Sequence, residues 1–247
     1  MQVRMVPNRC TAQHDAAVGP CAHCAIRTLA VCSVLHDSEL DAFERIVTPV
    51  RREPGQAIFH EGDAAEHVYN ITEGVLKTFK LLPDGRRQIT GFSFEADFLG
   101  LALGDGEAFP HTAEALTTVH LCQMRRKDFE GMLERFPRME RRLLGMARDE
   151  LAVAQEQMLL LGRKHADERV ASFLVSLAER AQRFGQKGDM LSLPMTRTDI
   201  ADYLGLTLET VSRTMSRLKR EKCLAPKGRQ DLKIVDLERL RDIGAGG

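Results

Sequence analysis

The sequence lacks any run of about 18 apolar residues, the length that a membrane-spanning helix requires. Its opening residues, MQVRMVPNRC, also lack the apolar core of a secretion signal. We therefore expect a cytoplasmic protein with no membrane partner, whose six cysteines stay reduced and serve thiolate, metal or redox chemistry. The chain has no G-x4-G-K-[ST] loop, no H-E-x2-H helix and no obvious base beside a cysteine, which predicts that it is not an enzyme.

The chain also lacks a net charge, which argues against a protein that coats nucleic acid by bulk electrostatics. Charge is unevenly placed, however, because residues 196–233 contain nine basic and five acidic residues. That segment can form a compact basic face, although a solvated helix surface would have the same composition. At 247 residues, 43% of them apolar, the chain is long enough for two folded domains.

Short apolar segments separated by turn signals fill residues 49–122. This texture predicts antiparallel strands in a sandwich or barrel. Before them, a capping-box pattern at Ser38 and Asp41 predicts a short helix over about residues 38–47.

A long helix is predicted from Pro137, because apolar residues recur three and four positions apart over nearly three heptads. The recurring positions are Leu144, Ala147, Leu151, Ala154, Met158 and Leu161. Such a seam is typical of a two-stranded dimer helix, so we expect it to form a homodimer interface. The alternative is a helix that is buried against its own domain only.

A helix-turn-helix pattern follows in TRTDIADYLGLTLETVSRTMSRLKRE, which begins at Thr196. Thr196 and Asp199 can cap a first helix, because a threonine and a carboxylate three residues apart satisfy each other's main-chain N–H groups. Gly205 supplies the tight turn, and Thr207 can cap the second helix.

The second helix of this motif has exposed first turns that suit the major groove of double-stranded DNA. Arg213 can hold guanine bidentately, Glu209 can accept a hydrogen bond from cytosine, and Ser212 can contact several bases. In the alternative interpretation, Glu209 complements the helix dipole and pairs with Arg213. The expected DNA-binding surface also includes Thr196, Arg197, Thr207 and Arg217.

Four cysteines have the spacing of a soft-metal site. Cys21 and Cys24 are spaced C-x2-C, Cys32 follows after seven more residues, and Cys122 lies far downstream. Together they can hold an iron–sulfur cluster or zinc, and the spacing alone does not choose the metal. The remaining two are interpreted as a spare thiol, Cys10, and a buried structural thiol, Cys223.

The order of these parts, together with LTLETVSR, resembles the CRP/FNR superfamily of bacterial transcription regulators over essentially the whole chain. The cysteine cluster, PDGRRQITGF and the E-x2-S-R motif are similar to its oxygen-responsive FNR branch, including FnrL-like and FixK-like members. The resemblance implies an α+β fold in four parts. They are a cysteine-rich segment (1–36), an antiparallel β roll (37–136), a dimerisation helix (137–163) and a winged helix-turn-helix (164–247).

The resemblance further implies that Cys21, Cys24, Cys32 and Cys122 hold a 4Fe-4S cluster when oxygen is absent. It also implies a homodimer that binds a TTGAT-like palindrome. RNA polymerase is an implied partner through the exposed Pro83-Asp84-Gly85, although a plain hairpin turn explains those residues equally well. The alternative is a zinc-stabilised or thiol-redox regulator of the same family that uses the same cysteines.

Two departures from the family pattern concern ligand binding and dimerisation. Members that bind cyclic AMP resemble G-E-L followed by R-[ST]-A, but the matching stretches here are Gly100-Leu101-Ala102 and His111-Thr112-Ala113. Both polar ligands are missing, so no cyclic nucleotide is expected.

Ala154 stands where many FNR-type members carry an aspartate, and it removes a like-charge pair from the seam. We hypothesise that the metal-free form therefore dimerises more readily than an aspartate-bearing relative.

Overall fold

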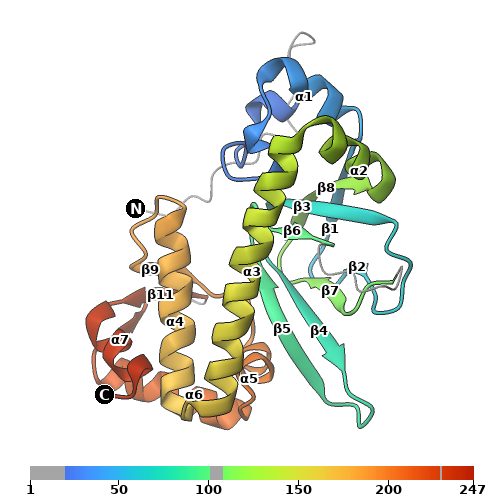
Figure 1. The fold of residues 1–247 in the computed structure, drawn as a ribbon. Coiled ribbons are helices and arrows are strands. Elements are labelled where there is room, and N and C mark those ends of the chain that lie inside the picture. The colour runs from blue at the N-terminus through green and yellow to red at the C-terminus, as the bar shows by residue number, and fades with distance from the viewer. Residues whose placement is uncertain (1–19, 101–107, 229) are drawn as a thin grey trace. The chain divides into compact units, whose positions relative to one another are not determined.

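The computed structural model describes residues 20–100, 108–228 and 230–247 (Figure 1). Contacts within the chain divide it into two compact units. The first unit contains the residues up to Lys80 together with Thr90–Leu151, and the second contains Leu81–Ile89 and Ala152–Gly247. In the described ranges, no helix is long and apolar enough to cross a lipid bilayer.

Two four-stranded sheets make the β roll, with the strand orders β1-β8-β3-β6 and β2-β7-β4-β5. Neighbouring strands pair antiparallel, as the turn-rich sequence predicts, which confirms the expected fold class. The strands are β1 (Val47–Arg52), β2 (Ala57–Phe59), β3 (His67–Glu73), β4 (Leu76–Leu81), β5 (Arg87–Ser93), β6 (Phe98–Leu99), β7 (Thr112–Ala115) and β8 (Val119–Arg125).

Apolar side chains from both sheets form the core of the roll. Ile71 and Leu76 are fully buried, and the ring of Phe59 stacks on that of Phe109 with 3.7 Å between their centroids. Because side chains alternate along a strand, Leu121 of β8 points into this core and Cys122 points to the opposite face of the sheet. Core packing therefore fixes the direction of Cys122.

Before the roll, the chain forms two short 3-10 helices, η1 (Pro20–His23) and η2 (Val31–Val34), and helix α1 (Asp37–Glu44). The expected helix over 38–47, capped at Ser38, was wrong at both ends. Glu39 accepts a hydrogen bond from the main-chain N–H of His36 at 2.8 Å, so the first turn starts earlier. At the other end, Val47 already pairs with Met124 of β8.

Helix α2 (Arg126–Arg135) follows β8 and leads into the long helix α3 (Pro137–Arg163). Pro137 occupies the first turn, where its missing N–H removes no helical hydrogen bond. Three seam residues of α3 are largely exposed: 56% for Leu144, 57% for Leu151 and 71% for Met158. A line of exposed apolar side chains is typical of a contact surface for another chain.

The second unit contains helices around a small antiparallel sheet of order β10-β11-β9 (Figure 1). Helix α4 packs against α7, and α5 packs against α6. The elements are α4 (Ala166–Arg183), β9 (Met190–Ser192), α5 (Arg197–Leu204), α6 (Leu208–Arg220), β10 (Leu224–Pro226), β11 (Asp231–Ile234) and α7 (Leu237–Ala245).

Candidate nucleic-acid interface and cysteine site

The α5–α6 turn has the local chemistry that the sequence predicts. Thr196 donates its main-chain N–H to Asp199 at 2.9 Å, and its hydroxyl accepts the N–H of Asp199 at 3.0 Å. Gly205 ends α5 with φ +61°, in the left-handed region where a side chain is strained. The hydroxyl of Thr207 accepts the N–H of Thr210 at 3.2 Å at the start of α6. Both expected caps and the glycine turn are confirmed.

Asp199 also takes part in an ion pair that sequence reasoning did not predict. It is 3% exposed, and Arg87 donates to it at 3.0 Å and to Asp202 at 2.8 Å. Gln88 donates to the main-chain oxygen of Asp202 at 2.7 Å. All four residues belong to the second compact unit. The tip of the β4–β5 hairpin therefore helps to hold α5, the helix on which α6 packs.

Helix α6 has one buried face and one exposed face. Val211, Met215 and Leu218 are at most 2% exposed and hold the helix against its unit. Glu209 and Arg213 are exposed, and no hydrogen bond or ion pair joins their side chains to another residue in the described part of the chain. Glu209 and Arg213 therefore do not pair with each other, contrary to the alternative interpretation. Both are free to contact a ligand.

Two other expected DNA-binding arginines lie partly inside the protein. Arg217 pairs with Asp167 of α4 at 2.8 Å, and the hydroxyl of Thr214 donates to the same carboxylate at 2.8 Å. These contacts tie α6 to α4. Burial also lowers the pKa of the half-buried Arg197 from its ordinary value. By contrast, Thr196 and Thr207 are exposed.

The four predicted cysteine ligands lie within electrostatic range of one another. Cys122, in the middle of β8, faces Pro49 of β1 and Asn70 of β3 across the sheet. The charges of Cys21, Cys24 and Cys32 all act to raise the pKa of Cys122. The chain thus brings the N-terminal cysteines close to one strand of the roll.

Burial disfavours the thiolate form of Cys21, Cys32 and Cys122. Burial, then Glu44 and the neighbouring thiols, raises the pKa of Cys21 to about 12. Burial raises the pKa of Cys32 to about 11, although the nearby Arg27 acts in the opposite direction. Burial and the other three thiols also raise the pKa of Cys122 far above its ordinary value.

The described part of the chain holds no group of three or more His, Cys, Asp or Glu side chains placed so as to bind a metal ion. The cysteine site therefore offers nearby thiols without a closed metal geometry. Of the two remaining cysteines, Cys223 is buried, with 1% exposure, and Cys10 lies outside the described residues. Leu101 and Ala102, named above for nucleotide binding, also lie outside them.

Two arginines hold the segment that carries the first three cysteines. Arg27 donates to the main-chain oxygen of Cys32 at 2.6 Å and also to that of Leu35. From α3, Arg142 donates to the main-chain oxygen of Leu29 at 2.5 Å. Leu29 lies in the loop between Cys24 and Cys32.

The second link from α3 is the pair between Arg138 and Glu39 of α1, in which both carboxylate oxygens accept at 2.7 Å. We call Arg138 and Arg142, one helical turn apart, the arginine link. Sequence reasoning missed it, because arginines at the start of a helix are ordinary surface residues until their partners are known.

Known proteins match both parts of this chain. Residues 49–136 match the family model described as "Cyclic nucleotide-binding domain", and residues 168–243 match "Crp-like helix-turn-helix domain". The chain is 44% identical to the transcriptional activatory protein AadR of Rhodopseudomonas palustris, over 90% of this chain and 92% of the relative. It is 39% identical to the transcriptional activator protein FnrL of Cereibacter sphaeroides, over 89% and 90%. The chain belongs to the CRP/FNR family of transcription regulators.

A solved member of the CRP/FNR family has the same fold. The structure of FixK2 from Bradyrhizobium japonicum aligns with a TM-score of 0.73 at 37% identity, over 80% of this chain and 97% of that one. A mutant of CooA from Carboxydothermus hydrogenoformans aligns with a TM-score of 0.66 over 81% and 88%, but at 18% identity. That second likeness concerns the fold alone.

Replacing Arg87 by alanine is expected to lower the free energy of unfolding of the second unit by about 1 to 3 kcal/mol, because the buried Asp199 loses a cationic partner. The matched control is Arg86→Ala, since Arg86 is 77% exposed and pairs with the neighbouring Asp84 on the surface. We expect little effect from this control. Urea titration followed by circular dichroism measures both variants, and equal losses of stability would contradict the prediction.

Alkylation of Cys32 in the metal-free protein is expected to be at least about tenfold slower at pH 8 than that of an unstructured thiol, because only the thiolate reacts. Since the pKa of Cys32 is raised to about 11, the rate should climb steadily as the pH rises toward that value. Mass spectrometry of iodoacetamide-treated protein measures it. Protein unfolded in urea is the control, and identical rates in the folded and unfolded chains would refute the expectation.

Proposed function

We propose that this protein is an oxygen-responsive transcription activator of the FNR type. In this proposal a 4Fe-4S cluster on Cys21, Cys24, Cys32 and Cys122 controls dimerisation and binding to a TTGAT-like palindrome. The observation that supports it is the electrostatic proximity of three N-terminal thiols to Cys122 of the roll. The relatives AadR and FnrL are named transcriptional activators, which favours activation as the outcome.

The chemistry of the donor set fits an iron–sulfur cluster. All four candidate ligands are thiols, and soft thiolates are the usual ligands of such clusters. Zinc accepts the same donors and remains the alternative. When bound, a cluster supplies a redox centre that oxygen can oxidise. Cys21, Cys24, Cys32 and Cys122 would hold it. The burial of Cys32 would keep water away, and Arg27 would place its positive charge beside the ligands.

The arginine link supports a route from the cysteine site to the dimer seam. Arg142 binds the loop between two candidate ligands, while Leu144 begins the exposed seam on the same helix. At 3.6 residues per turn, residues two positions apart point in nearly opposite directions, so one face of α3 holds the segment and the other is free to pair. Ordering of the segment would thereby fix the start of α3 and favour the paired seam.

The dimer proposed here uses Leu144, Ala147, Leu151, Ala154, Met158 and Leu161. Ala154 is exposed in the chain and brings no charge into the seam, so we propose that the metal-free protein dimerises more readily than an aspartate-bearing relative. Two copies would present two α6 helices to the two halves of a palindrome. RNA polymerase is the proposed partner at Pro83-Asp84-Gly85.

DNA reading is assigned to Glu209, Ser212 and Arg213 of α6. Two observations support this assignment. Glu209 and Arg213 are exposed, and the opposite face of α6 is buried and fixes the helix in place. Arg217 is proposed to border the DNA while it holds α6 to α4. Thr196, Arg197 and Thr207 complete the proposed surface.

A cyclic nucleotide is not proposed as a ligand of the roll. His111 stands where the nucleotide-binding members have an arginine, and burial lowers its pKa, so its imidazole is neutral at pH 7. The ring of Phe59 lies against the partly buried His111, with 5.9 Å between centroids, and against the core residue Phe109. A neutral imidazole offers no charge to a cyclic phosphate, unlike the arginine of the nucleotide-binding members.

Anaerobic purification followed by iron and sulfide analysis tests the cluster. Alanine at Cys32 or Cys122 is expected to abolish iron binding, because each removes a proposed ligand. Alanine at Cys10 or Cys223 is the matched control and should leave the iron content unchanged. Iron-free wild-type protein, or zinc in its place, would reject the cluster and favour the alternative.

Arg213→Ala is expected to weaken binding to the palindrome by about 10- to 100-fold, because a bidentate contact to guanine is worth about 1 to 3 kcal/mol. Arg220, the exposed last residue of α6, provides the control Arg220→Ala, which should weaken specific and random DNA alike and only slightly. Fluorescence anisotropy at fixed salt measures both. Equal effects of the two substitutions on specific DNA would contradict the assignment of Arg213.

A further inference from the structure

Asn70 is a buried side chain of the roll that nothing above explains. It lies in β3, is 3% exposed, and its side-chain oxygen has no hydrogen-bond partner in the described structure. Burying a carboxamide without partners costs about 1 to 3 kcal/mol. An unpartnered buried polar group of this kind calls for an explanation.

The sheet register places Asn70 directly across from Cys122. Asn70 faces Cys122 on one side and Phe98 of β6 on the other. Directly opposed residues of antiparallel strands point to the same face, with Cβ atoms about 4.5 to 5.5 Å apart. Asn70 is therefore next to the proposed fourth ligand, on the face that carries it.

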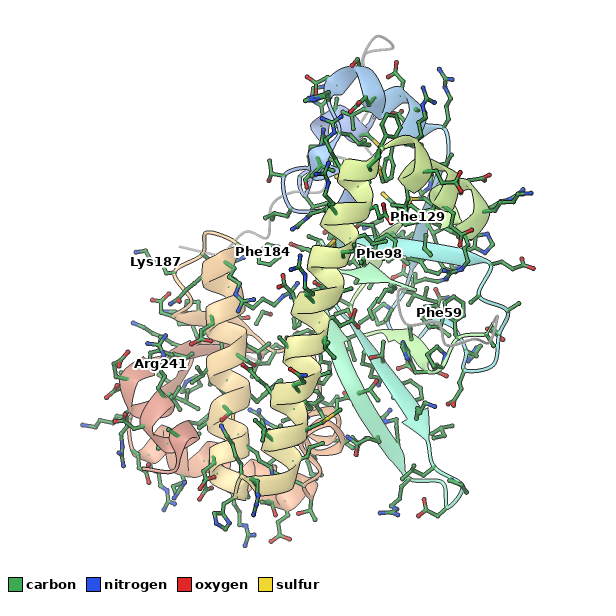
Figure 2. The ribbon with its side chains drawn as sticks, in the orientation of Figure 1. Phe59, Phe98, Phe129, Phe184, Lys187 and Arg241 are labelled. Carbon is green, nitrogen blue, oxygen red and sulfur yellow. The ribbon has the colours of Figure 1, made fainter. Side chains whose placement is uncertain are left out.

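The other neighbour of Asn70 across the sheet is apolar and offers no hydrogen bond. Phe98 packs against Phe129 of α2, with 5.1 Å between ring centroids (Figure 2). On the side of β8 the neighbour is Cys122, and a thiol is only a weak hydrogen-bond partner. A thiolate would accept an amide N–H far more strongly.

We propose that Asn70 is a positioning residue for the cluster, whose carboxamide N–H donates to the sulfur of Cys122 once that sulfur is a thiolate ligand. Half a turn of the carboxamide exchanges its oxygen and nitrogen, so the same buried position can present a donor. Hydrogen bonds to ligand sulfurs set the potential of an iron–sulfur cluster. The inference rests on the proposed cluster and adds a residue that stabilises it.

Asn70→Leu removes the carboxamide while keeping a branched side chain with the same number of heavy atoms, and it is expected to have opposite effects in the two states. Cluster-loaded protein should lose its visible absorption in air about tenfold faster than wild type, as for other residues that bond to metal ligands. The metal-free variant should resist urea at least as well as wild type, because an unpartnered polar group has been removed. A purely structural role predicts the reverse in the metal-free protein.

Two further variants sharpen the test. Asn70→Asp places an acceptor-only carboxylate beside the sulfur and should shorten the cluster lifetime further. The control is Thr78→Val, a similarly conservative change at a buried polar residue of the other sheet, which bonds to Thr90 at 3.1 Å. Its cluster should decay at the wild-type rate.

Each outcome decides the proposal. Iron-free wild-type protein would contradict the cluster and, with it, the role of Asn70. If wild type holds iron but Asn70→Leu decays no faster than Thr78→Val, the role of Asn70 is overturned while the cluster stands. A metal-free Asn70→Leu protein that unfolds at clearly lower urea than wild type would also overturn it, because Asn70 would then have a structural partner.

Discussion

Three of the four thiols near β8, those of Cys21, Cys32 and Cys122, are disfavoured as thiolates by their burial, which raises the pKa of each. Burial raises the pKa of Cys21 to about 12 and that of Cys32 to about 11, and each thiolate would also repel the others. Arg27 offsets part of this penalty and binds the main-chain oxygen of Cys32. Under the proposed function, the binding of a positively charged metal would favour deprotonation of these thiols and their approach to one another. Protonation and ligand geometry are therefore coupled at this site, and the segment that holds it should be better ordered when it is loaded.

The position of the fourth thiol depends on the packing of the roll. Leu121 is part of the apolar core and Cys122 is its neighbour in the strand. A register shift of one residue would therefore turn Cys122 into the core and Leu121 to the face that carries the candidate ligand. Burial of the core makes such a shift costly. Hence a site that gathers distant parts of the sequence needs no dedicated scaffold, because the roll that forms the hydrophobic core also aims Cys122 and Asn70 at the same face.

Local patterns in the sequence predicted local structure well. The caps at Thr196 and Thr207, the glycine turn at Gly205 and the start of α3 at Pro137 each depend on neighbouring residues, and each was found. The start of α1 was misplaced, because Glu39 competes with Asp41 as the capping carboxylate. Tertiary partners were not predictable from one sequence. The pairs Arg87–Asp199, Arg217–Asp167 and Arg138–Glu39 join residues that only the folded chain brings together.

The apolar seam of α3 would limit how far cluster binding at the cysteine site can shift the proposed monomer–dimer equilibrium. A ligand shifts a two-state equilibrium only by the difference in its affinity for the two states. In the proposed dimer, exposed Leu144, Leu151 and Met158 would favour pairing, and Ala154 would add no repulsion to oppose it. The arginine link would then act on an equilibrium that is partly biased toward the dimer before any cluster binds. For such a protein, the change in dimer population on cluster binding depends on how stable the metal-free dimer is. Stabilising the metal-free dimer leaves a smaller fraction of monomer for cluster binding to convert.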